Sequence, residues 1–453
     1  MRLIARVRRS PILQAVGSNV ATQLALTVAQ LATVPVLLGG WGAARYGVWL
    51  MLFALPAAIA MADLGLATAA GNDMTAKVAR GERAAAAQLY GAIRALVLGV
   101  AGLVILATAC TLVIAPDLLD GAQDAAKGRA TATALVLAIY GAVALQNGVT
   151  AAGMRATGGY AAFGYGMAAM LLTEAVGAMA LVAWGADLLT VACFYLLARA
   201  AGAGALAWLL ARRAPWLVGW ARPSIAAVRP LLRPALALVA GLGAQMVAIQ
   251  GPLLAIGFVL GSAAVPVFTT LRTLSRVVVQ AVMIVTHSVM PSFTAAMAVA
   301  DTPKVARLAG ISVGTALALA VPGALILLFA GQQLVEIWTG GALRPDFALV
   351  AIMAATVVLT ALWLAVSNLI LAINRHEGYA WWHLAAAITA LLLSLPLLRW
   401  LGVEGAAWAL LMLELAMLWR VASLARRLDL LDMSAAAKDI RRAMGRLRAR
   451  RSE

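Results

Sequence analysis

Residues 346–371 read DFALVAIMAATVVLTALWLAVSNLIL, an apolar run with no charged residue after Asp346. An apolar helix needs roughly 20 residues to cross the hydrocarbon core of a bilayer, and this run is long enough. Similar runs recur from about residue 12 to residue 425, and 64% of the 453 residues are hydrophobic while only 12% are charged. The sequence therefore predicts a polytopic membrane protein.

These apolar runs predict helices, because they lack the alternation of polar and apolar residues that the strands of a membrane barrel show. Charged clusters and Gly or Pro turns divide the chain into about twelve spans. We therefore expect an all-α fold with two six-helix lobes. The expected spans are 12–38, 46–70, 89–115, 130–152, 161–184, 188–211, 233–258, 265–291, 306–330, 346–371, 379–400 and 405–425.

The basic residues predict the orientation, because Lys and Arg in short loops are retained on the cytoplasmic side of a membrane. With twelve spans, most basic residues fall on the same side as both termini. We therefore expect cytoplasmic N- and C-termini and a multi-pass protein of the cell inner (plasma) membrane. The outer loops would keep only Arg45, Lys127, Arg129, Arg344 and Arg399.

The formal charge of +17, from 35 basic and 18 acidic residues, is typical of such a protein with a basic tail. Nucleic acid is therefore not an expected partner, whereas membrane lipids are. From about Ser434 the tail is either a basic amphipathic helix on anionic headgroups or a solvated segment. The two cysteines, Cys110 and Cys193, fall inside expected helices, so they predict core residues and neither a disulfide framework nor a zinc site.

A weak internal match at an offset of 219 residues suggests a duplication, because the same offset occurs twice. Residues 42–49 align with 261–268, and residues 159–161 align with 378–380. Six helices in each half would make the halves parallel repeats related by an axis along the membrane normal. We expect an N-terminal lobe at 1–211, a basic linker at 212–232, a C-terminal lobe at 233–425 and a basic tail at 426–453.

Three segments resemble a known family. They are Gly42–Trp49 (GAARYGVW), Met61–Leu66 (MADLGL) and Val265–Arg276 (VPVFTTLRTLSR), and they are similar to polysaccharide and O-antigen repeat-unit flippases of the MOP flippase superfamily. The resemblance implies a V-shaped transporter with two lobes and alternating access. It also implies a substrate, an undecaprenyl-pyrophosphate-linked oligosaccharide moved from the cytoplasmic to the periplasmic leaflet. Whether a polysaccharide polymerase is a partner stays open.

Two other transporters of the same superfamily are alternatives, a MATE-type cation-coupled drug exporter and a lipid-II flippase. The second ranks lower because the first helix lacks the expected Arg. An enzyme is not expected, since the three histidines have no metal-ligand spacing and no nucleotide-binding motif or cofactor site is evident. The outer loops 116–129 and 331–345 are too short for a membrane glycosyltransferase or polymerase.

Candidate site residues are the ionisable groups at membrane depth, which are costly unless they face a cavity or a partner. Arg272 and Arg276 are spaced i, i+4 on one helix face, where they can hold a pyrophosphate through bidentate hydrogen bonds. The alternative is that Arg272 reaches outward while Arg276 pairs with a carboxylate. Arg199 is expected either to pair with Glu174 or to bind substrate.

The remaining candidates are polar groups whose partners the sequence does not identify. Asp63, Glu174 and Glu414 are candidate coupling sites, and Asp63 is otherwise a helix cap. Arg94, one turn inside its span, is expected to reach the cytoplasmic interface. In total four arginines and three acids lie within spans, which favours an anionic substrate over the cations of a drug exporter. Gln23, Gln30, Gln245 and Gln250 either line a cleft or bond between helices.

Overall fold

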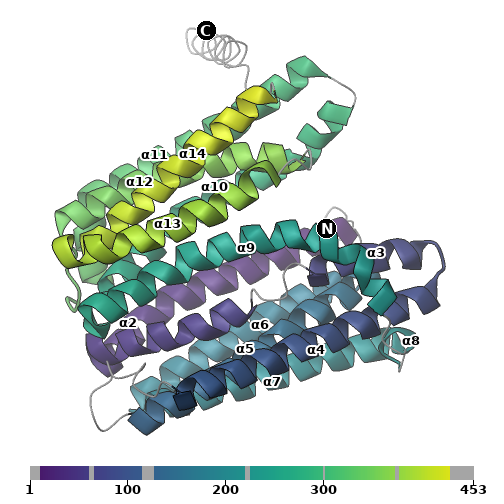
Figure 1. Ribbon diagram of the computed structural model, residues 1–453, viewed down its shortest axis with the longest axis horizontal. Helices are drawn as coiled ribbons and strands as arrows, with labels where there is room; N and C mark the ends of the chain where they lie inside the picture. The colour runs from purple at the N-terminus through teal and green to yellow at the C-terminus, as the bar shows by residue number, and fades with distance from the viewer. Residues whose placement is uncertain are drawn as a thin grey trace, which may run out of the picture. The chain divides into compact units, whose positions relative to one another are not determined.

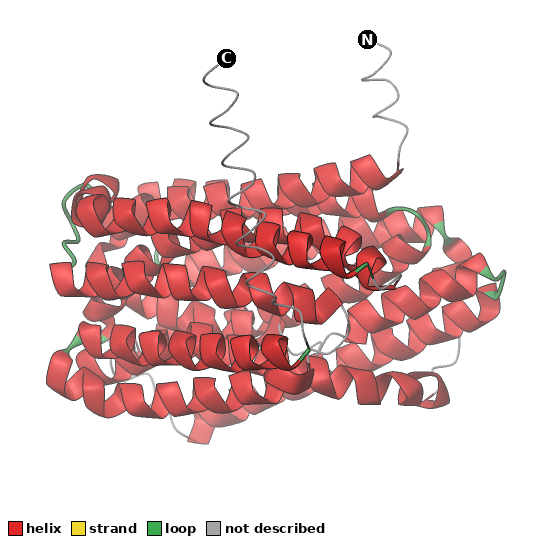
Figure 2. Ribbon diagram, turned by 90° about the horizontal axis from the view of Figure 1, so that it is seen from above, coloured by secondary structure: helices red, strands yellow, loops and turns green. Residues whose placement is uncertain are grey.

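The chain is helical throughout the part that the structure describes. Within these residues it forms thirteen α-helices, one short 3-10 helix and no strand (Figure 2). Asp63, the N-terminal arginines and most of the basic tail lie outside this part, so the predictions on them are not addressed. The computed structural model describes residues 11–60, 66–114, 127–219, 225–298, 301–372 and 377–428.

The bounds of the elements are as follows. In the first half they are α2 (Pro11–Ala60), α3 (Leu66–Ala79), α4 (Arg83–Ile114), α5 (Lys127–Ala156), α6 (Tyr160–Ala183), α7 (Leu188–Arg213) and α8 (Pro215–Val218). In the second they are α9 (Ile225–Leu260), η3 (Ser262–Ala264), α10 (Val265–Ala298), α11 (Thr302–Trp338), α12 (Phe347–Ala372), α13 (Glu377–Leu401) and α14 (Val403–Arg427).

Eleven helices among the described residues are long and apolar enough to cross a membrane. The first of these spans, Gly17–Ile59, contains a break at Gly42, where the backbone leaves the helical region and two helices meet. Division at this break gives the twelve spans predicted from the sequence. The predicted second span, 46–70, covers the end of α2 (to Ala60) and the start of α3 (from Leu66), and the residues between them lie outside the described part.

Two glycines aligned by the 219-residue offset share an unusual backbone conformation. Gly42 has φ 72° and ψ 168°, and Gly261 has φ 91° and ψ 160°. L-residues with a side chain rarely adopt a positive φ, whereas glycine does so at little cost. Both glycines separate consecutive membrane helices, so this shared geometry agrees with the duplication inferred from the sequence.

The two glycine turns also approach each other closely. A Cβ atom built on Gly47 would overlap the backbone carbonyl of Ser262, so there is no room for a side chain at this position. The Gly47 segment of α2 therefore packs directly on η3.

We predict that Gly47→Ala destabilises the protein by about 1–3 kcal/mol, because the added methyl group overpacks a backbone contact that cannot yield. Gly99→Ala on α4 is the matched control, since nothing lies within 4 Å of its Cβ position. The control should be neutral or stabilising by up to about 1 kcal/mol, from helix propensity. Thermal unfolding of the purified protein in detergent measures both, and equal melting temperatures would contradict the close approach.

The chain divides into two compact units. Unit 1 comprises residues 1–266 and 338–342, and unit 2 comprises residues 267–337 and 343–453. The main boundary between the two units, after residue 266, lies beyond the linker predicted at 212–232. The reason is that α9 packs against α2, α3 and α4 of unit 1. The lobe boundaries inferred from the internal repeat stay a prediction.

Small residues form much of the helix packing in unit 2. A core of Ala316, Ala320, Ala354, Val357 and Ala361 joins α11 to α12. Small residues are common at helix contacts where the solvent is as apolar as the side chains.

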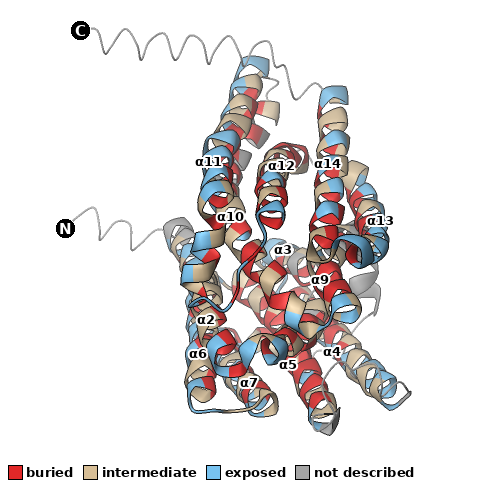
Figure 3. Cartoon of the chain, turned by 90° about the vertical axis from the view of Figure 1, so that its left-hand side faces the viewer, coloured by how far each residue is buried: buried red, intermediate tan, exposed pale blue. Residues whose placement is uncertain are grey.

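Exposed residues lie along α11 and α13 (Figure 3), and large apolar residues are among them. Phe329 on α11 is 74% exposed and Trp400 on α13 is 80% exposed. Cys110 and Cys193 are exposed too, so the prediction that they are core residues is wrong. In a membrane helix an apolar residue type does not indicate burial, because the lipid-facing side is as apolar as the packed side.

Asp187 caps the N-terminus of α7. Its carboxylate accepts hydrogen bonds from the Thr190 amide at 3.0 Å and from the Thr190 hydroxyl at 2.6 Å. These bonds, together with the charge of Arg129, hold the pKa of Asp187 below its usual value.

We predict that Asp187→Ala costs about 1 kcal/mol of stability, whereas Asp187→Asn keeps the cap and costs less. Because the pKa of Asp187 is lowered in the folded state, its contribution is present at neutral pH and is lost as the pH falls below about 4. Melting temperatures measured against pH test this. Wild type should lose more stability on acidification than Asp187→Asn, and parallel curves would contradict it.

Candidate functional site

Unit 1 contains a buried ion pair at membrane depth. Arg199 on α7 donates from a terminal guanidinium nitrogen to Glu174 on α6, at 2.7 Å. Tyr140 on α5 completes a triangle, because its hydroxyl accepts a bond from Arg199 and donates one to Glu174 at 3.2 Å. Both charged side chains are under 10% exposed. The pairing predicted from the sequence is therefore present, and the group joins three helices.

Aromatic rings surround one side of this ion pair. The Tyr195 ring lies edge-on to Tyr140 at 5.7 Å and to Phe53 at 5.4 Å. Phe53 continues to Trp49 at 5.3 Å, and the Arg199 guanidinium lies over the Tyr140 ring at 4.8 Å. Water is largely excluded from such a group, so the attraction between the two charges is stronger than at a surface.

Two polar atoms of the ion pair remain without hydrogen bonds. Oε1 of Glu174 and Nε of Arg199 are inaccessible to solvent and have no partner in the described structure. Unsatisfied buried polar atoms are costly. The Glu174 Oε1 can therefore accept a proton or a hydrogen bond, and the Nε–H of Arg199 can donate one.

We predict that Arg199→Met or Glu174→Leu alone destabilises the protein by about 3–5 kcal/mol, because each leaves an uncompensated buried charge. The double variant should cost less than the sum of the two single variants, since it removes both charges. Arg94→Met is the control, expected within about 0.5 kcal/mol, because Arg94 is exposed. Additive single effects in a denaturant titration would contradict the pairing.

Unit 2 contains a second buried carboxylate, Glu414 on α14. One of its oxygens accepts a hydrogen bond from the Trp363 indole N–H of α12. The His383 ring of α13 lies edge-on to Trp363 at 5.5 Å. Arg272 on α10 interacts electrostatically with Glu414. The partner of Glu414 thus comes from other helices, as its isolated position in the sequence requires.

Arg272 and Arg276 lie on the same face of α10 but have different environments. Arg272 is half-buried, near Glu414 and 5.9 Å from the Phe268 ring centre. Arg276 is exposed and makes no hydrogen bond or ion pair with the described residues. The alternative drawn from the sequence was that Arg272 reaches outward while Arg276 pairs with a carboxylate. In the structure the carboxylate of Glu414 lies near Arg272, and Arg276 is exposed.

Arg94 lies deeper in its helix than the sequence suggests. Because α4 begins at Arg83, Arg94 stands about 16 Å along the helix rather than one turn inside it. Arg94 is exposed and, like Arg276, makes no hydrogen bond or ion pair with the described residues. The start of α4 therefore does not place the charge of Arg94 at the membrane interface.

The four glutamines differ in exposure. Gln23, Gln30 and Gln250 are half-buried, and Gln245 is exposed.

Tyr140 and Trp363 were missed by the sequence reasoning, although each bonds one of the buried acids. An aromatic residue with a polar tip in an apolar span is the signal that would have found them, because buried Tyr and Trp usually need a hydrogen-bond partner.

Comparison with known proteins bears on the fold. No protein-family model and no curated protein matches the sequence. The structure is similar to an inward-facing multidrug resistance MATE family transporter of the MOP superfamily, with 15% identity, a TM-score of 0.75 and coverage of 91% of this chain and 96% of that one. An outward-facing structure of such a transporter has 17% identity, a TM-score of 0.64 and coverage of 95% and 97%.

The chain has the fold of these MATE transporters. A third similar structure is a MOP superfamily transporter from Pyrococcus furiosus, described by a reverse polarity of its binding pocket that suggests a different function. It has 16% identity, a TM-score of 0.63 and coverage of 95% of this chain and 98% of that one. At these identities the likeness concerns the fold, and the site residues have to be argued from this chain.

Proposed function

We propose that this protein is a transporter that moves an anionic, lipid-linked oligosaccharide across the membrane by alternating access. The substrate class is the undecaprenyl-pyrophosphate-linked repeat unit that the sequence resemblance implies. The MATE-type fold supports transport, and the resemblance covers the segment Val265–Arg276, which carries both arginines of α10.

The observation that carries this proposal is the balance of charge at membrane depth. Glu174 is paired with Arg199, and Glu414 is hydrogen-bonded by Trp363. Both buried acids among the described residues therefore have partners. In contrast, the exposed cations Arg94 and Arg276 have none among the described residues.

At membrane depth the described side chains thus carry more positive than negative charge, which favours the binding of an anionic substrate. Arg272 and Arg276, one turn apart, match a pyrophosphate, because two guanidinium groups can each form bidentate, charge-assisted hydrogen bonds with its oxygens. The charge of Arg272 is partly balanced by the nearby Glu414. Arg276 therefore supplies the larger share of the attraction for the pyrophosphate. Both arginines belong to one helix, and their separation does not depend on how the two units are placed.

The second candidate is a MATE-type cation-coupled drug exporter. The similar solved structures include multidrug resistance MATE transporters, and two buried acids are available for coupling. We favour the anionic substrate because both acids already have hydrogen-bond donors, which lowers their affinity for a cationic drug. The pocket of the Pyrococcus furiosus transporter suggests that polarity separates functions within this fold. Within either function, Glu174 and Glu414 are our candidates for coupling.

We predict that cells without this protein accumulate lipid-linked oligosaccharide on the cytoplasmic leaflet, and that wild type relieves the accumulation. Arg272→Ala combined with Arg276→Ala should not relieve it, because each lost charge-assisted contact weakens substrate binding by about 10- to 100-fold. The replacement of both residues by Lys keeps the charge and should restore part of the activity. The readout is the ratio of the two leaflet pools, measured with an impermeant sugar-modifying enzyme.

The matched control is Arg307→Ala, which removes an exposed arginine near the start of α11. It should behave as wild type at equal membrane levels of protein. Full activity of the double Ala variant would exclude the arginine site. An unchanged glycolipid pool after deletion, with raised drug sensitivity, would replace the flippase by the exporter.

A further inference from the structure

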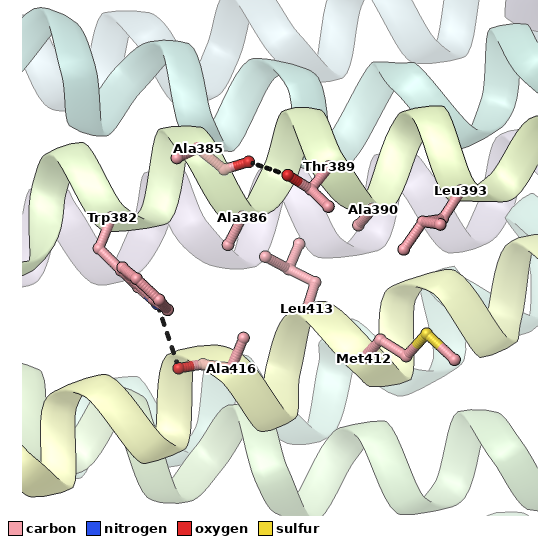
Figure 4. Close-up of a pocket in the computed structure, with 9 residues that line it drawn as sticks. All are labelled: Trp382, Ala385, Ala386, Thr389, Ala390, Leu393, Met412, Leu413 and Ala416. Atoms are coloured by element: carbon pink, nitrogen blue, oxygen red, sulfur yellow. Dashed lines mark hydrogen bonds between the residues drawn. The ribbon is translucent and has the colours of Figure 1, made fainter.

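A groove of about 360 Å³ lies between α13 and α14, two helices of unit 2 that run side by side (Figures 1 and 4). Small residues make it possible, because Ala386, Ala390 and Ala416 leave space where larger side chains would fill the contact. The Trp382 indole bounds one end and Leu393 lies toward the other. Trp382 and Leu393 are 40% and 44% exposed, so the groove opens to the surface of the unit.

The groove offers no free polar group to a ligand. Its only hydroxyl, that of Thr389, donates to the Ala385 carbonyl at 2.9 Å. The Trp382 indole N–H donates to the Ala416 carbonyl at 3.3 Å. All other side chains in the lining are apolar. The chemistry therefore selects a hydrocarbon.

The dimensions fit one acyl chain. From Trp382 to Leu393 the helix rises about 16 Å, close to the roughly 15 Å of hydrocarbon in one leaflet of a bilayer. The volume corresponds to about a dozen groups of the size of a water molecule, at about 30 Å³ each. A chain much longer than one leaflet would extend beyond Leu393.

The Trp382 end carries the features of a membrane interface. The Trp382 and Trp419 rings lie 5.5 Å apart, and tryptophans concentrate at the level of the headgroups. Arg420 follows directly and donates to the Gly378 carbonyl at 3.0 Å. Arg426 and Arg427 are exposed in the last turn of α14. This end is therefore positively charged, and it attracts an anionic headgroup.

We infer that this groove is a binding site for an anionic phospholipid, with one acyl chain between α13 and α14 and the headgroup at the arginines that end α14. The charge of the helix end selects the headgroup, and the length of the groove selects an acyl chain of one leaflet. The inference does not depend on which substrate the protein transports, since none of these residues belongs to the proposed arginine site.

Native mass spectrometry of the full chain in detergent, titrated with palmitoyl-oleoyl phosphatidylglycerol or phosphatidylcholine, tests the site. Wild type should retain one phosphatidylglycerol in preference to phosphatidylcholine. Ala390→Phe should lower that affinity by about 10-fold or more, because the ring fills the groove and displaces several methylene groups. Ala386→Leu is a milder filling variant, for use if the first does not fold. Leu392→Phe, on an exposed face of α13 outside the lining, should bind as wild type.

The headgroup is tested by Arg426→Gln with Arg427→Gln. This variant should lose about 30-fold in affinity for phosphatidylglycerol and little for phosphatidylcholine, as expected for two cations near an anionic headgroup. Unchanged binding in a folded groove-filling variant would overturn the proposal, and so would equal affinity of wild type for the two lipids. Tighter binding of a polyprenyl phosphate that displaces phosphatidylglycerol would assign the groove to a polyprenyl chain instead.

Discussion

A charge carried into the hydrocarbon core must find a partner or a polar cavity, and this constraint organises the polar residues of the chain. In unit 1, Arg199 and Glu174 satisfy it together, with Tyr140 as a shared partner. In unit 2, Glu414 accepts a hydrogen bond from Trp363 of α12. Each group links separate helices, so it fixes which helix faces meet. The helices themselves would form without it, because their backbone hydrogen bonds lie within each helix.

The apolar residues solve a different problem, that of bringing helices together in an apolar solvent. Glycine permits the closest backbone contacts, which include Gly47 with Ser262 and Gly405 of α14 with Leu397 of α13. Alanine forms much of the core shared by α11 and α12. Along α13 and α14 a groove lined by Ala386, Ala390 and Ala416 accompanies the close contact of Gly405. Small side chains therefore serve both close packing and the space that we assign to a lipid chain.

The proposed transport site and the proposed lipid site use arginine differently. Arg276 presents a cation without a described partner on an apolar helix, which is costly unless an anion or water meets it. The arginines that end α14 lie where a headgroup region is expected, so their charge costs little. The first set is thus suited to a transported anion and the second to a resident lipid. The MATE-type fold provides the frame for both, but their chemistry comes from side chains of this chain.

The sequence by itself determined that the chain crosses a membrane repeatedly as helices. Apolar runs of this length have no other stable form in lipid, and the run at 346–371 became α12 almost residue for residue. It also determined the i, i+4 spacing of the two α10 arginines and the 219-residue repeat that aligns Gly42 with Gly261. Only the tertiary structure decided which groups meet, such as Glu414 with Trp363, and which apolar residues are buried. Hydropathy separates lipid from water, but it does not separate the packed face of a helix from the lipid-facing one, because both are equally apolar.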